Sequence, residues 1–433
     1  MNKTTSYLQW FYLTIGSILM FLPANLHAAE KERIVLESSM VRPFAKQGGT
    51  LKVDLGLSLH PFGSSTTDYS FACFIDGQET KTYTAADWGQ LDYTSRRKIF
   101  YLPLPPDISL GEHKLAIAMR RHVDGKKIED QRLDASFRVY RDTLPRQKFL
   151  VEHFTATWCP HCPVTILALE DVNKHCPDVA WVSIHCEDYY AVNGNETFRY
   201  INSVRGYPSV YADRRYFEEI NSWRIGMAKY NENIPSQEIA NEHYPRISNT
   251  PIPSLATIQI TPQYTAATRT CQIKVDVQTV EEFEKVFGPA ALTVVMVEDS
   301  IPTLHNNVLR HIISQPQGDA IQWDGKRYSK TYQVKIANNW NPQQIKVVAY
   351  VGRQANINDP NDDLAETYVT NTERVPILSQ GTTTSISSIS HKAITSVERY
   401  DAMGRKIVRP MPGLNILRYS DGRVEKHWIK ELK

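Results

Sequence analysis

Two cysteines, Cys159 and Cys162, stand three positions apart in this chain, after an apolar run at residues 149–151 and before a segment with helical character. A Cys-x-x-Cys pair in the first turn of a helix that follows a strand can alternate between a dithiol and a disulfide. Unpaired backbone N–H groups at the start of the helix point towards the first sulfur and favour its thiolate. Because the thiolate is the species that attacks a disulfide, the pair predicts thiol–disulfide exchange.

The residues around the pair extend this signal. Residues 154–163 are Phe-Thr-Ala-Thr-Trp-Cys-Pro-His-Cys-Pro. This segment, with Trp158 before the first cysteine, resembles the active-site segment of the thioredoxin superfamily. The resemblance implies that Cys159 is the exposed nucleophile and that Cys162, deeper in the helix, resolves the mixed disulfide. It implies no cofactor other than the redox-active disulfide Cys159–Cys162.

A histidine lies between the cysteines. His161 can place a partial positive charge near the Cys159 sulfur, and thiolates at such sites titrate at roughly 3.5 to 7. A lower thiol pKa stabilises the dithiol and makes the disulfide more oxidising. The same Pro-His pair occurs in DsbA-type periplasmic disulfide oxidases, but the rest of the chain does not resemble them.

A second segment supports the same fold. Residues 204–211, Val-Arg-Gly-Tyr-Pro-Ser-Val-Tyr, resemble the segment of thioredoxin-like proteins that carries a cis-proline. The resemblance implies that Pro208 packs opposite the dithiol, and that Tyr207 and Trp158 contact an extended substrate. A Gly-x-Pro sequence is otherwise a plain turn, but the order of strand, dithiol, helix, strand and then proline favours the cis form.

One position departs from the family pattern. Thioredoxins have a buried Asp, and DsbA-type proteins a Glu, six residues before the first cysteine, whereas this chain has His153, preceded by Glu152. Because a strand alternates its faces, only one of these two side chains can point towards the dithiol. His153 could act as the base that deprotonates the deeper thiol, or it could be a packed core histidine. Both interpretations stay open.

The N-terminus has the pattern of a secretory signal. Lys3 precedes an apolar core at residues 10–22, and small residues follow near Ala28. The apolar core is shorter than the ~20 residues that span a bilayer, which favours a cleaved signal over a membrane anchor. We therefore expect an exported protein with periplasmic transit and no transmembrane span in the mature chain. The net charge of +2 gives no case for nucleic-acid binding.

Export changes how the remaining cysteines are interpreted, because disulfides persist outside the cytoplasm. Cys176 ends the predicted helix and Cys186 follows the next predicted strand. They could form a structural disulfide or remain as buried free thiols. Cys73 and Cys271 lie in strand-like segments of different domains, and we expect both to be buried.

The sequence gives little support for a metal site. No second Cys-x-x-Cys is present to complete four zinc ligands. His305 and His311 stand close together in the chain but have no carboxylate partner. We expect no bound metal.

Changes of pattern along the chain predict a multidomain α/β and β protein, in which a thioredoxin-like domain is flanked by antiparallel β-sandwich domains. Short period-two runs favour sandwiches, and a Ser/Thr-rich stretch favours a linker. The predicted parts are a signal peptide (1–28), an N-terminal β-sandwich (30–145), a thioredoxin-like domain (146–250), a second β-sandwich (251–377), a linker (378–390) and a small C-terminal β domain (391–433).

The C-terminal segment has motifs of its own. Residues 400–405 are Tyr-Asp-Ala-Met-Gly-Arg, residues 412–415 Pro-Gly-Leu-Asn and residues 420–423 Ser-Asp-Gly-Arg. The order of these motifs resembles the C-terminal sorting domain of type IX secretion substrates. The resemblance implies that the type IX machinery is a partner, and that the protein reaches the cell surface or outer membrane, or is secreted. An ordinary small β module is the alternative, with Asp421-Gly422 as its hairpin turn.

Together these features resemble the thioredoxin-like outer-membrane and surface proteins of Bacteroidetes. The sequence therefore predicts an exported thiol–disulfide oxidoreductase that acts on protein thiols and disulfides. The alternative is a surface interaction or adhesion protein in which the thioredoxin-like domain is a structural scaffold. Peroxide reduction and haem-protein maturation are further activities of this fold.

Overall fold

The computed structural model describes residues 33–123, 126–215, 224, 233–302, 306–356, 366–378, 397–409, 411–419 and 424–429. The predicted signal peptide and nearly all of the predicted linker lie outside these residues. The described chain forms several sheets and few helices, so the prediction of a β-rich protein is confirmed. It divides into unit 1 (Met1–Arg42, Gly49–Leu104 and His113–Phe137) and unit 2 (Pro43–Gly48, Pro105–Glu112 and Arg138–Lys433).

Strands of the N-terminal region form two main sheets. The three-stranded sheet has the order β1 (Arg33–Val41), β3 (Thr50–His60), β8 (Arg97–Pro103). The five-stranded sheet has the order β2 (Phe44–Lys46), β10 (Lys126–Tyr140), β9 (Gly111–Val123), β5 (Tyr69–Ile75), β6 (Gln78–Thr84). The remaining elements are the pair β4 (Ser65–Thr66) and β7 (Leu91–Asp92), and the short helix α1 (Ala85–Trp88).

Within unit 1, the three-stranded sheet packs against strands of the five-stranded sheet. The alternating Leu51, Val53 and Leu55 of β3 are fully buried, as the period-two pattern predicts. The ring of Tyr83 on β6 lies 4.6 Å from the ring of Phe100 on β8, which joins the two sheets through aromatic contact.

An eight-stranded mixed sheet forms the centre of unit 2, with the order β13-β11-β12-β17-β16-β20-β21 and β18 paired to β16. Its strands are β11 (Phe149–Thr155), β12 (Val179–His185), β13 (Ser209–Ala212), β16 (Ala290–Glu298), β17 (Val308–Ile312), β18 (Asp319–Ala320), β20 (Ile345–Arg353) and β21 (Val369–Pro376). The helices of the unit are α2 (Cys162–His175), α3 (Asn195–Ile201), α4 (Ser236–Ser248) and α5 (Phe283–Phe287).

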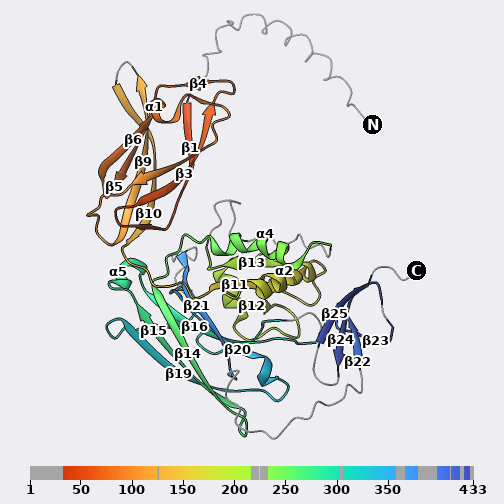
Figure 1. Ribbon diagram of the computed structural model, residues 1–433. Helices are drawn as coiled ribbons and strands as arrows, with labels where there is room; N and C mark the ends of the chain where they lie inside the picture. Colours follow the sequence, from red (N-terminus) through yellow and green to blue (C-terminus); the bar gives the residue numbers. More distant parts are fainter. Residues whose placement is uncertain are drawn as a thin grey trace, which may run out of the picture. The chain divides into compact units, whose positions relative to one another are not determined.

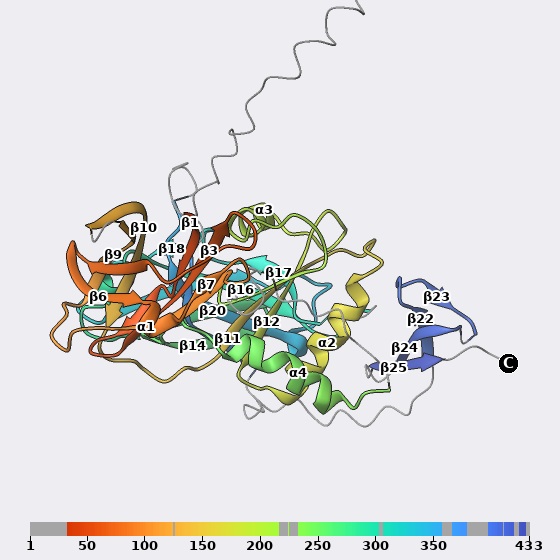
Figure 2. The same cartoon turned by 90° about the horizontal axis from the view of Figure 1, so that it is seen from above.

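The two faces of this sheet carry separate cores. Helices α2 and α4 lie side by side over β11, β12 and β13 (Figure 1), where α2 contributes Ile166, Leu169 and Val172 to one buried cluster. Helix α3 lies on the opposite side of β11 and β12 (Figure 2), and its Phe198 joins the second cluster with residues of β16 and β20. Both faces of β11 and β12 are thus buried, as their near-continuous apolar sequences require.

The sheet continues across the predicted domain boundary at 250/251, which differs from the expectation of a separate second β-sandwich over 251–377. Strand β17 pairs in parallel with β12, with Ser183 opposite Val308, and β16, β20 and β21 follow. A second sheet, β14 (Ala256–Thr265), β15 (Thr270–Thr279) and β19 (Arg327–Lys335), has β14 in contact with β20 and β21. Period-two patterning predicts strands but does not give their partners, and the free edge of β12 is covered by pairing.

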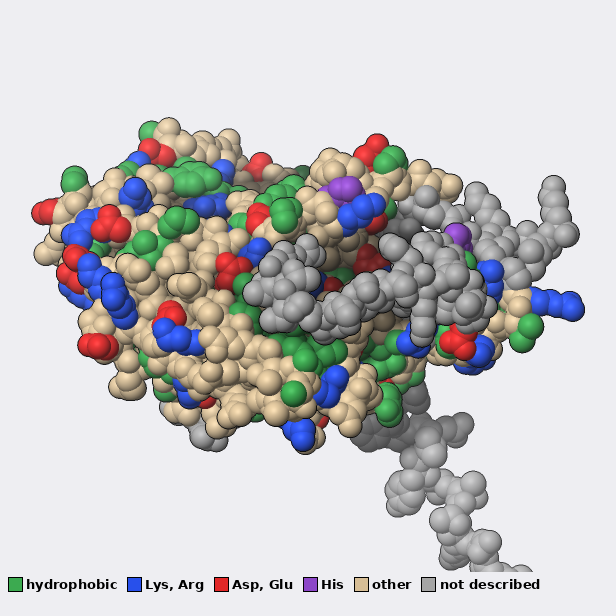
Figure 3. All heavy atoms as spheres, turned by 60° about the horizontal axis from the view of Figure 1, so that its bottom comes forward, with side chains coloured by type: hydrophobic (Ala, Val, Ile, Leu, Met, Phe, Trp, Pro, Cys, Tyr) green, Lys and Arg blue, Asp and Glu red, His purple; other side chains and the backbone are tan. Residues whose placement is uncertain are grey.

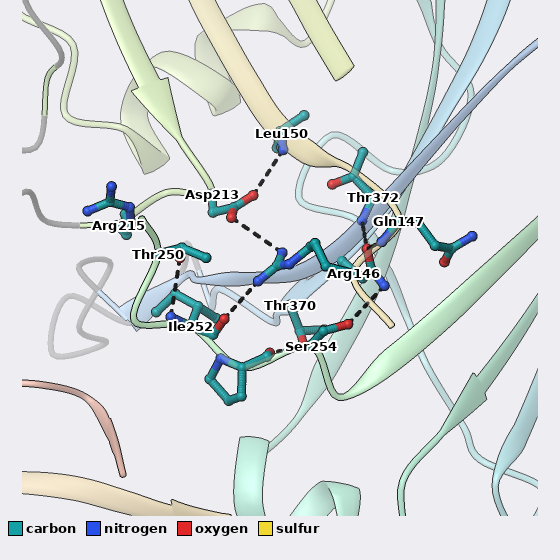
Figure 4. Close-up of polar contacts among 12 residues, drawn as sticks. Arg146, Gln147, Leu150, Asp213, Arg215, Thr250, Ile252, Ser254, Thr370 and Thr372 are labelled. Atoms are coloured by element: carbon teal, nitrogen blue, oxygen red, sulfur yellow. Dashed lines mark hydrogen bonds and ion pairs between the residues drawn. The ribbon is translucent and has the colours of Figure 1, made fainter. Parts of the chain in front are cut away.

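Buried polar contacts join the segments on the two sides of that boundary (Figure 4). Arg146, just before β11, contacts the carboxylate of Asp213 at 3.3 Å and donates to the carbonyl of Ile252 at 2.7 Å. Asp213, which follows β13, also accepts the backbone N–H of Leu150 at 2.9 Å. Burial raises the pKa of Asp213 and lowers that of Arg146, so the pair is an internal structural contact rather than a surface one.

The C-terminal residues form a four-stranded sheet of order β23-β22-β24-β25, made of β22 (Val397–Asp401), β23 (Lys406–Ile407), β24 (Gly413–Tyr419) and β25 (Val424–Ile429). Strands β24 and β25 are antiparallel neighbours. The turn predicted at Asp421-Gly422 lies outside the described residues. Within the described chain, helices long and apolar enough to cross a membrane are absent.

Candidate active site

The two cysteines of the predicted redox pair are joined. Cys159 and Cys162 form a disulfide, with their Cα atoms 5.5 Å apart. Helix α2 begins at Cys162, and His161 is its N-cap. Cys159 therefore precedes the helix, in a turn closed by its N–H to the carbonyl of Ala156 at 3.1 Å. We had expected both cysteines in the first helical turn; the loop residue Pro160 separates Cys159 from it.

Both sulfur-bearing residues are largely covered. Cys162 is 1% exposed and Cys159 is 4% exposed. Cys159 is the more accessible of the two, but it is much less exposed than the sequence predicts. It packs with Cys162 and Ala156 in a small cluster against which Tyr207 lies. His161, in contrast, is exposed.

The predicted substrate-contact residues lie together beside the disulfide. The Tyr207–Pro208 peptide bond is cis, which confirms that prediction. Trp158 is half exposed, and its ring meets that of Tyr207 edge to face at 5.8 Å. The Trp158 Nε1–H donates to the carbonyl of Glu187 at 3.2 Å. Two segments far apart in the sequence therefore frame the disulfide with aromatic rings.

An ion pair that the sequence does not predict lies next to these rings. Arg199 of α3 pairs with Glu187 at 2.8 Å, and its guanidinium group lies 5.7 Å from the centre of the Tyr207 ring. Its side chain is 32% exposed and that of Glu187 is 57% exposed. A cation over an aromatic ring stabilises the ring's orientation. The spacing of these residues in the chain gives no signal of the contact.

The side chains of Glu152 and His153 point to opposite faces of β11, as alternation requires. His153 lies on the α2 side, fully buried, with its Nδ1 atom 3.3 Å from the hydroxyl of Ser183 and its ring 6.2 Å from that of Trp181. His153 is therefore the member of the two that shares a face with the helix of the dithiol.

Glu152 belongs to a buried ionic cluster on the other face. Its carboxylate accepts hydrogen bonds from Arg214 at 2.6 and 2.8 Å, from Asn202 at 3.1 Å and from the hydroxyl of Tyr350 at 3.3 Å. Burial opposes the charge on Arg214, but the attraction of Glu152 outweighs it and raises the pKa of Arg214. Buried charges need such partners, and here they come from three segments distant in the sequence, so the sequence pattern did not reveal them.

A second buried acid lies at the end of β12. His185 Nδ1 is 2.7 Å from the Asp188 carboxylate, and Asp188 also accepts the backbone N–H groups of Thr157 at 2.7 Å and Tyr190 at 2.9 Å. Burial alone would raise the pKa of Asp188, but the hydrogen bonds from His185 and the two amides hold it below its ordinary value. The His-x-x-Asp spacing in the segment after a predicted strand is the only sequence signal that could have pointed to this pair.

The remaining cysteines are free thiols. Cys176 belongs to the core on the α2 side of the sheet and Cys186 to the core on the other side, so the sheet separates them and the structural disulfide is excluded. Cys73 and Cys271 are buried, as expected. Burial raises the pKa of Cys186 and Cys271 to about 11 and that of Cys73 to about 12.

The candidate histidine ligands do not form a metal site within the described residues. His305 lies outside them, and His311 is an exposed residue on β17. Groups of three or more His, Cys, Asp or Glu side chains suited to hold an ion are absent from the described part of the chain.

Charged side chains of both signs are interspersed on the face of the molecule seen in Figure 3. This distribution agrees with the net charge of +2.

Comparison with known proteins gives weak similarities. No protein-family model matches the chain, and no curated protein matches it. HBP35 of Porphyromonas gingivalis is similar in structure over 66% of this chain and 100% of its own, with 14% identity and a TM-score of 0.45. A domain of the outer membrane lipoprotein Omp28 from Porphyromonas gingivalis covers 29% of this chain and 88% of its own, with 16% identity and a TM-score of 0.22.

Dimeric latent PorU from Porphyromonas gingivalis is a further structural neighbour. It covers 79% of this chain, while this chain covers 20% of PorU, with 8% identity and a TM-score of 0.17. At such low TM-scores the three similarities assign neither a fold family nor an activity to the chain.

Proposed function

We propose that this chain is an exported thiol–disulfide oxidoreductase that acts on protein thiols and disulfides through Cys159 and Cys162. The observation that carries the proposal is the disulfide between them, which lies where β11 leads into α2 and is framed by Trp158, Tyr207 and the cis bond to Pro208. In this proposal these residues belong to a thioredoxin-like unit together with β11, α2, β12, α3 and β13.

The reaction needs no group beyond the two cysteines and a substrate dithiol. A substrate thiolate attacks Cys159 Sγ, the Cys159–Cys162 bond breaks, and Cys162 leaves as a thiolate that takes up one proton. A second substrate thiol loses its proton and attacks the substrate sulfur of the mixed disulfide, and Cys159 leaves as a thiolate. The substrate is oxidised to a disulfide and the protein is reduced to a dithiol. The reverse sequence reduces a substrate disulfide.

The surroundings of the disulfide support an extended polypeptide as substrate. Trp158 and Tyr207 offer a half-exposed aromatic edge next to the sulfur atoms, and aromatic rings contribute large contact areas in protein recognition. The backbone of Tyr207, before the cis bond to Pro208, would pair with the substrate main chain. Exchange at Cys159 then requires the substrate to uncover a residue that is 4% exposed.

His153 and His161 have different roles in this proposal. His161, exposed at the N-cap of α2, would favour the Cys159 thiolate through its partial positive charge. His153, on the buried face that α2 covers, would accept and return the proton of Cys162. An imidazole suits this task because its pKa lies near neutral pH.

Export and surface display complete the proposal. The apolar N-terminal segment would direct the chain out of the cytoplasm, and the C-terminal sheet β22–β25 would present the sorting motifs to the type IX machinery. The protein would then act at the cell surface or outer membrane, or after release, where disulfides persist.

The test compares the purified protein with Cys159→Ala in the reduction of insulin by dithiothreitol and in the reoxidation of a reduced protein. We expect the variant to lose at least 99% of the catalysed rate, because the attacked sulfur is missing. Cys73→Ala, which removes a buried free thiol of unit 1, is the matched control and should keep the rate. Equal and negligible rates for the wild-type protein and Cys159→Ala would end the proposal.

A second function is favoured by one observation, the burial of Cys159. In this case the disulfide is structural, and the protein is a surface interaction or adhesion protein that uses the thioredoxin-like unit as a scaffold. Exposed aromatic side chains of unit 1, Phe62 and Tyr93, form a ring pair with centroids 4.4 Å apart and would belong to such a contact surface. Alanine at both positions should then abolish binding to envelope preparations while leaving insulin reduction unchanged.

A further inference from the structure

The buried pair of Asp188 and His185 lies directly beside the loop that carries Cys159. The side chains are 2% and 0% exposed. One carboxylate oxygen of Asp188, Oδ2, accepts the backbone N–H of Thr157 at 2.7 Å and lies 2.7 Å from His185 Nδ1. The other, Oδ1, accepts the backbone N–H of Tyr190 at 2.9 Å.

This arrangement favours an ionised carboxylate. The backbone amides of Thr157 and Tyr190 donate to different oxygens, so both oxygens must accept. An amide side chain in place of the carboxylate would direct its NH₂ group at one of these backbone donors. Facing donors in a buried site leave at least one polar group unsatisfied. The lowered pKa of Asp188 agrees with this, since the hydrogen bonds outweigh the effect of burial.

The charge therefore lies close to the loop that carries the reactive sulfur. Thr155 lies opposite His185 in the parallel pair of β11 and β12, and the N–H of Cys186 donates to Thr155 at 2.9 Å, so this end of the sheet anchors the loop. Thr157 is two residues before Cys159, and two residues span at most about 7 Å. The carboxylate thus lies within about 10 Å of the Cys159 backbone.

We propose that Asp188 is a positioning residue of the dithiol, whose carboxylate fixes the backbone before Cys159 and whose negative charge makes the Cys159 thiolate less stable. The inference rests on the proposed function, but its consequence is chemical and can be measured without turnover. A less stable thiolate makes the disulfide less oxidising, so Asp188 favours reduction of substrate disulfides over the strongly oxidising behaviour that the Pro-His pair would suggest.

Other titratable and charged groups lie on the elements around this loop. His185 lies on β12 and neutralises part of the Asp188 charge when it is protonated. Further groups are His153 on β11, His161 at the N-cap of α2, Glu187 in the loop after β12, and Glu196 and Arg199 on α3. In contrast to the carboxylates of Glu187 and Glu196, that of Asp188 accepts a hydrogen bond from the backbone of the Cys159 loop.

The test is the pH dependence of Cys159 alkylation by iodoacetamide in the reduced protein, followed by mass spectrometry. In Asp188→Asn we expect the midpoint of Cys159 alkylation to fall by about one pH unit, the size expected for one charge at ~10 Å and an effective dielectric constant of ~20. Glu187→Gln is the matched control, because it removes the same charge from the same loop. Since Glu187 is exposed and paired with Arg199, its removal should shift the midpoint by less than half as much.

An unchanged midpoint in Asp188→Asn, or a shift no larger than that of Glu187→Gln, would overturn the inference. If the Asp188→Asn variant does not fold, amide hydrogen exchange of the wild-type protein tests the contact between Asp188 and the Thr157 amide. The Thr157 amide should then exchange at least a hundredfold more slowly than an unprotected amide, and exchange at the unprotected rate would contradict the proposed contact. A wild-type protein inactive towards insulin would instead refute the proposed function, while the alkylation midpoints still report on Asp188.

Discussion

Two buried acids, one inside β11 and the other just after the end of β12, have opposite surroundings. Glu152, inside β11, forms an ion pair with Arg214. Its carboxylate also accepts hydrogen bonds from Asn202, just after α3, and from Tyr350 on β20. Asp188, just after β12, contacts the imidazole of His185 and two backbone amides, one of which, that of Thr157, belongs to the loop before the dithiol. The first acid joins distant segments, and the second holds a loop. The buried charge of Glu152 therefore stabilises the fold in the interior of the unit. The buried charge of Asp188 positions a loop with a reactive group at the carboxyl end of β12.

The rate of cysteine alkylation should differ most strongly between the loop of the dithiol and the buried interior of the unit. In the reduced, native protein we expect alkylation of Cys159 at pH 8 and protection of Cys186, whose pKa is raised by burial to about 11. At that pKa the thiolate fraction at pH 8 is about a thousandth. Site-resolved mass spectrometry after short labelling measures both rates. Similar alkylation rates for Cys186 and Cys159 would mean that the loop of the dithiol and the buried interior do not differ in thiol reactivity.

Removal of Arg214 should have the largest effect on stability. Arg214→Ala leaves Glu152 as an unpaired buried charge, which costs about 3 to 5 kcal/mol of unfolding free energy. Urea titration at pH 7 measures this loss. Lys326→Ala is the control, since its pair with Glu281 is exposed and such pairs contribute about 1 kcal/mol or less.

In the fraction of Arg214→Ala that remains folded, the midpoint of Cys159 alkylation should stay at its wild-type value. A shift as large as that expected for Asp188→Asn would mean that the interior cluster also controls the dithiol, and that the two acids do not have separate roles.

Reduction of the disulfide should have a smaller effect on stability. Cys159 and Cys162 are three positions apart, and closing a loop of about four residues restricts the unfolded chain by about 2 kcal/mol. The urea midpoints of the oxidised and reduced proteins, measured with and without dithiothreitol, test this value. A loss of 5 kcal/mol or more on reduction would indicate a disulfide that the fold requires.

Acid should weaken the contribution of Asp188 in particular. Because its pKa is lowered in the folded state, Asp188 adds stability above the unfolded value of about 3.9, and this is lost as pH falls through the folded pKa. Asp188→Asn should cost about 1 to 3 kcal/mol at pH 7, and less below pH 4. Urea titrations of both proteins between pH 7 and pH 2.5 measure the difference. Parallel stability curves would contradict the assigned charge.

Local patterns predicted the parts of the site that adjacent residues determine. Alternation on β11 showed that only one of Glu152 and His153 could face the helix, and the order of elements before Pro208 predicted its cis bond. The strand predicted before Cys186 agrees with β12 (Val179–His185). The first feature depends on side-chain periodicity, and the second on the resemblance of residues 204–211 to the cis-proline segment of thioredoxin-like proteins.

Features that depend on distant partners could not be predicted in the same way. The continuation of the sheet through β17 rests on a pairing between Ser183 and Val308, and no local pattern selects that partner. Glu152 was recognised as a candidate for the dithiol, but its actual partners lie 50 or more positions away. The sequence gives no signal for Thr157, because its contribution is a backbone N–H, which every residue except proline carries.

The reduction potential of the Cys159–Cys162 disulfide tests the central claim most directly. The protein would be equilibrated with glutathione buffers of graded ratio, trapped with acid and alkylated, and its oxidised fraction measured by mass. The account predicts a potential above about −300 mV, in the range where exchange with protein thiols is feasible. A potential below that value would mark a structural bond that resists reduction, and would contradict a redox function for this site.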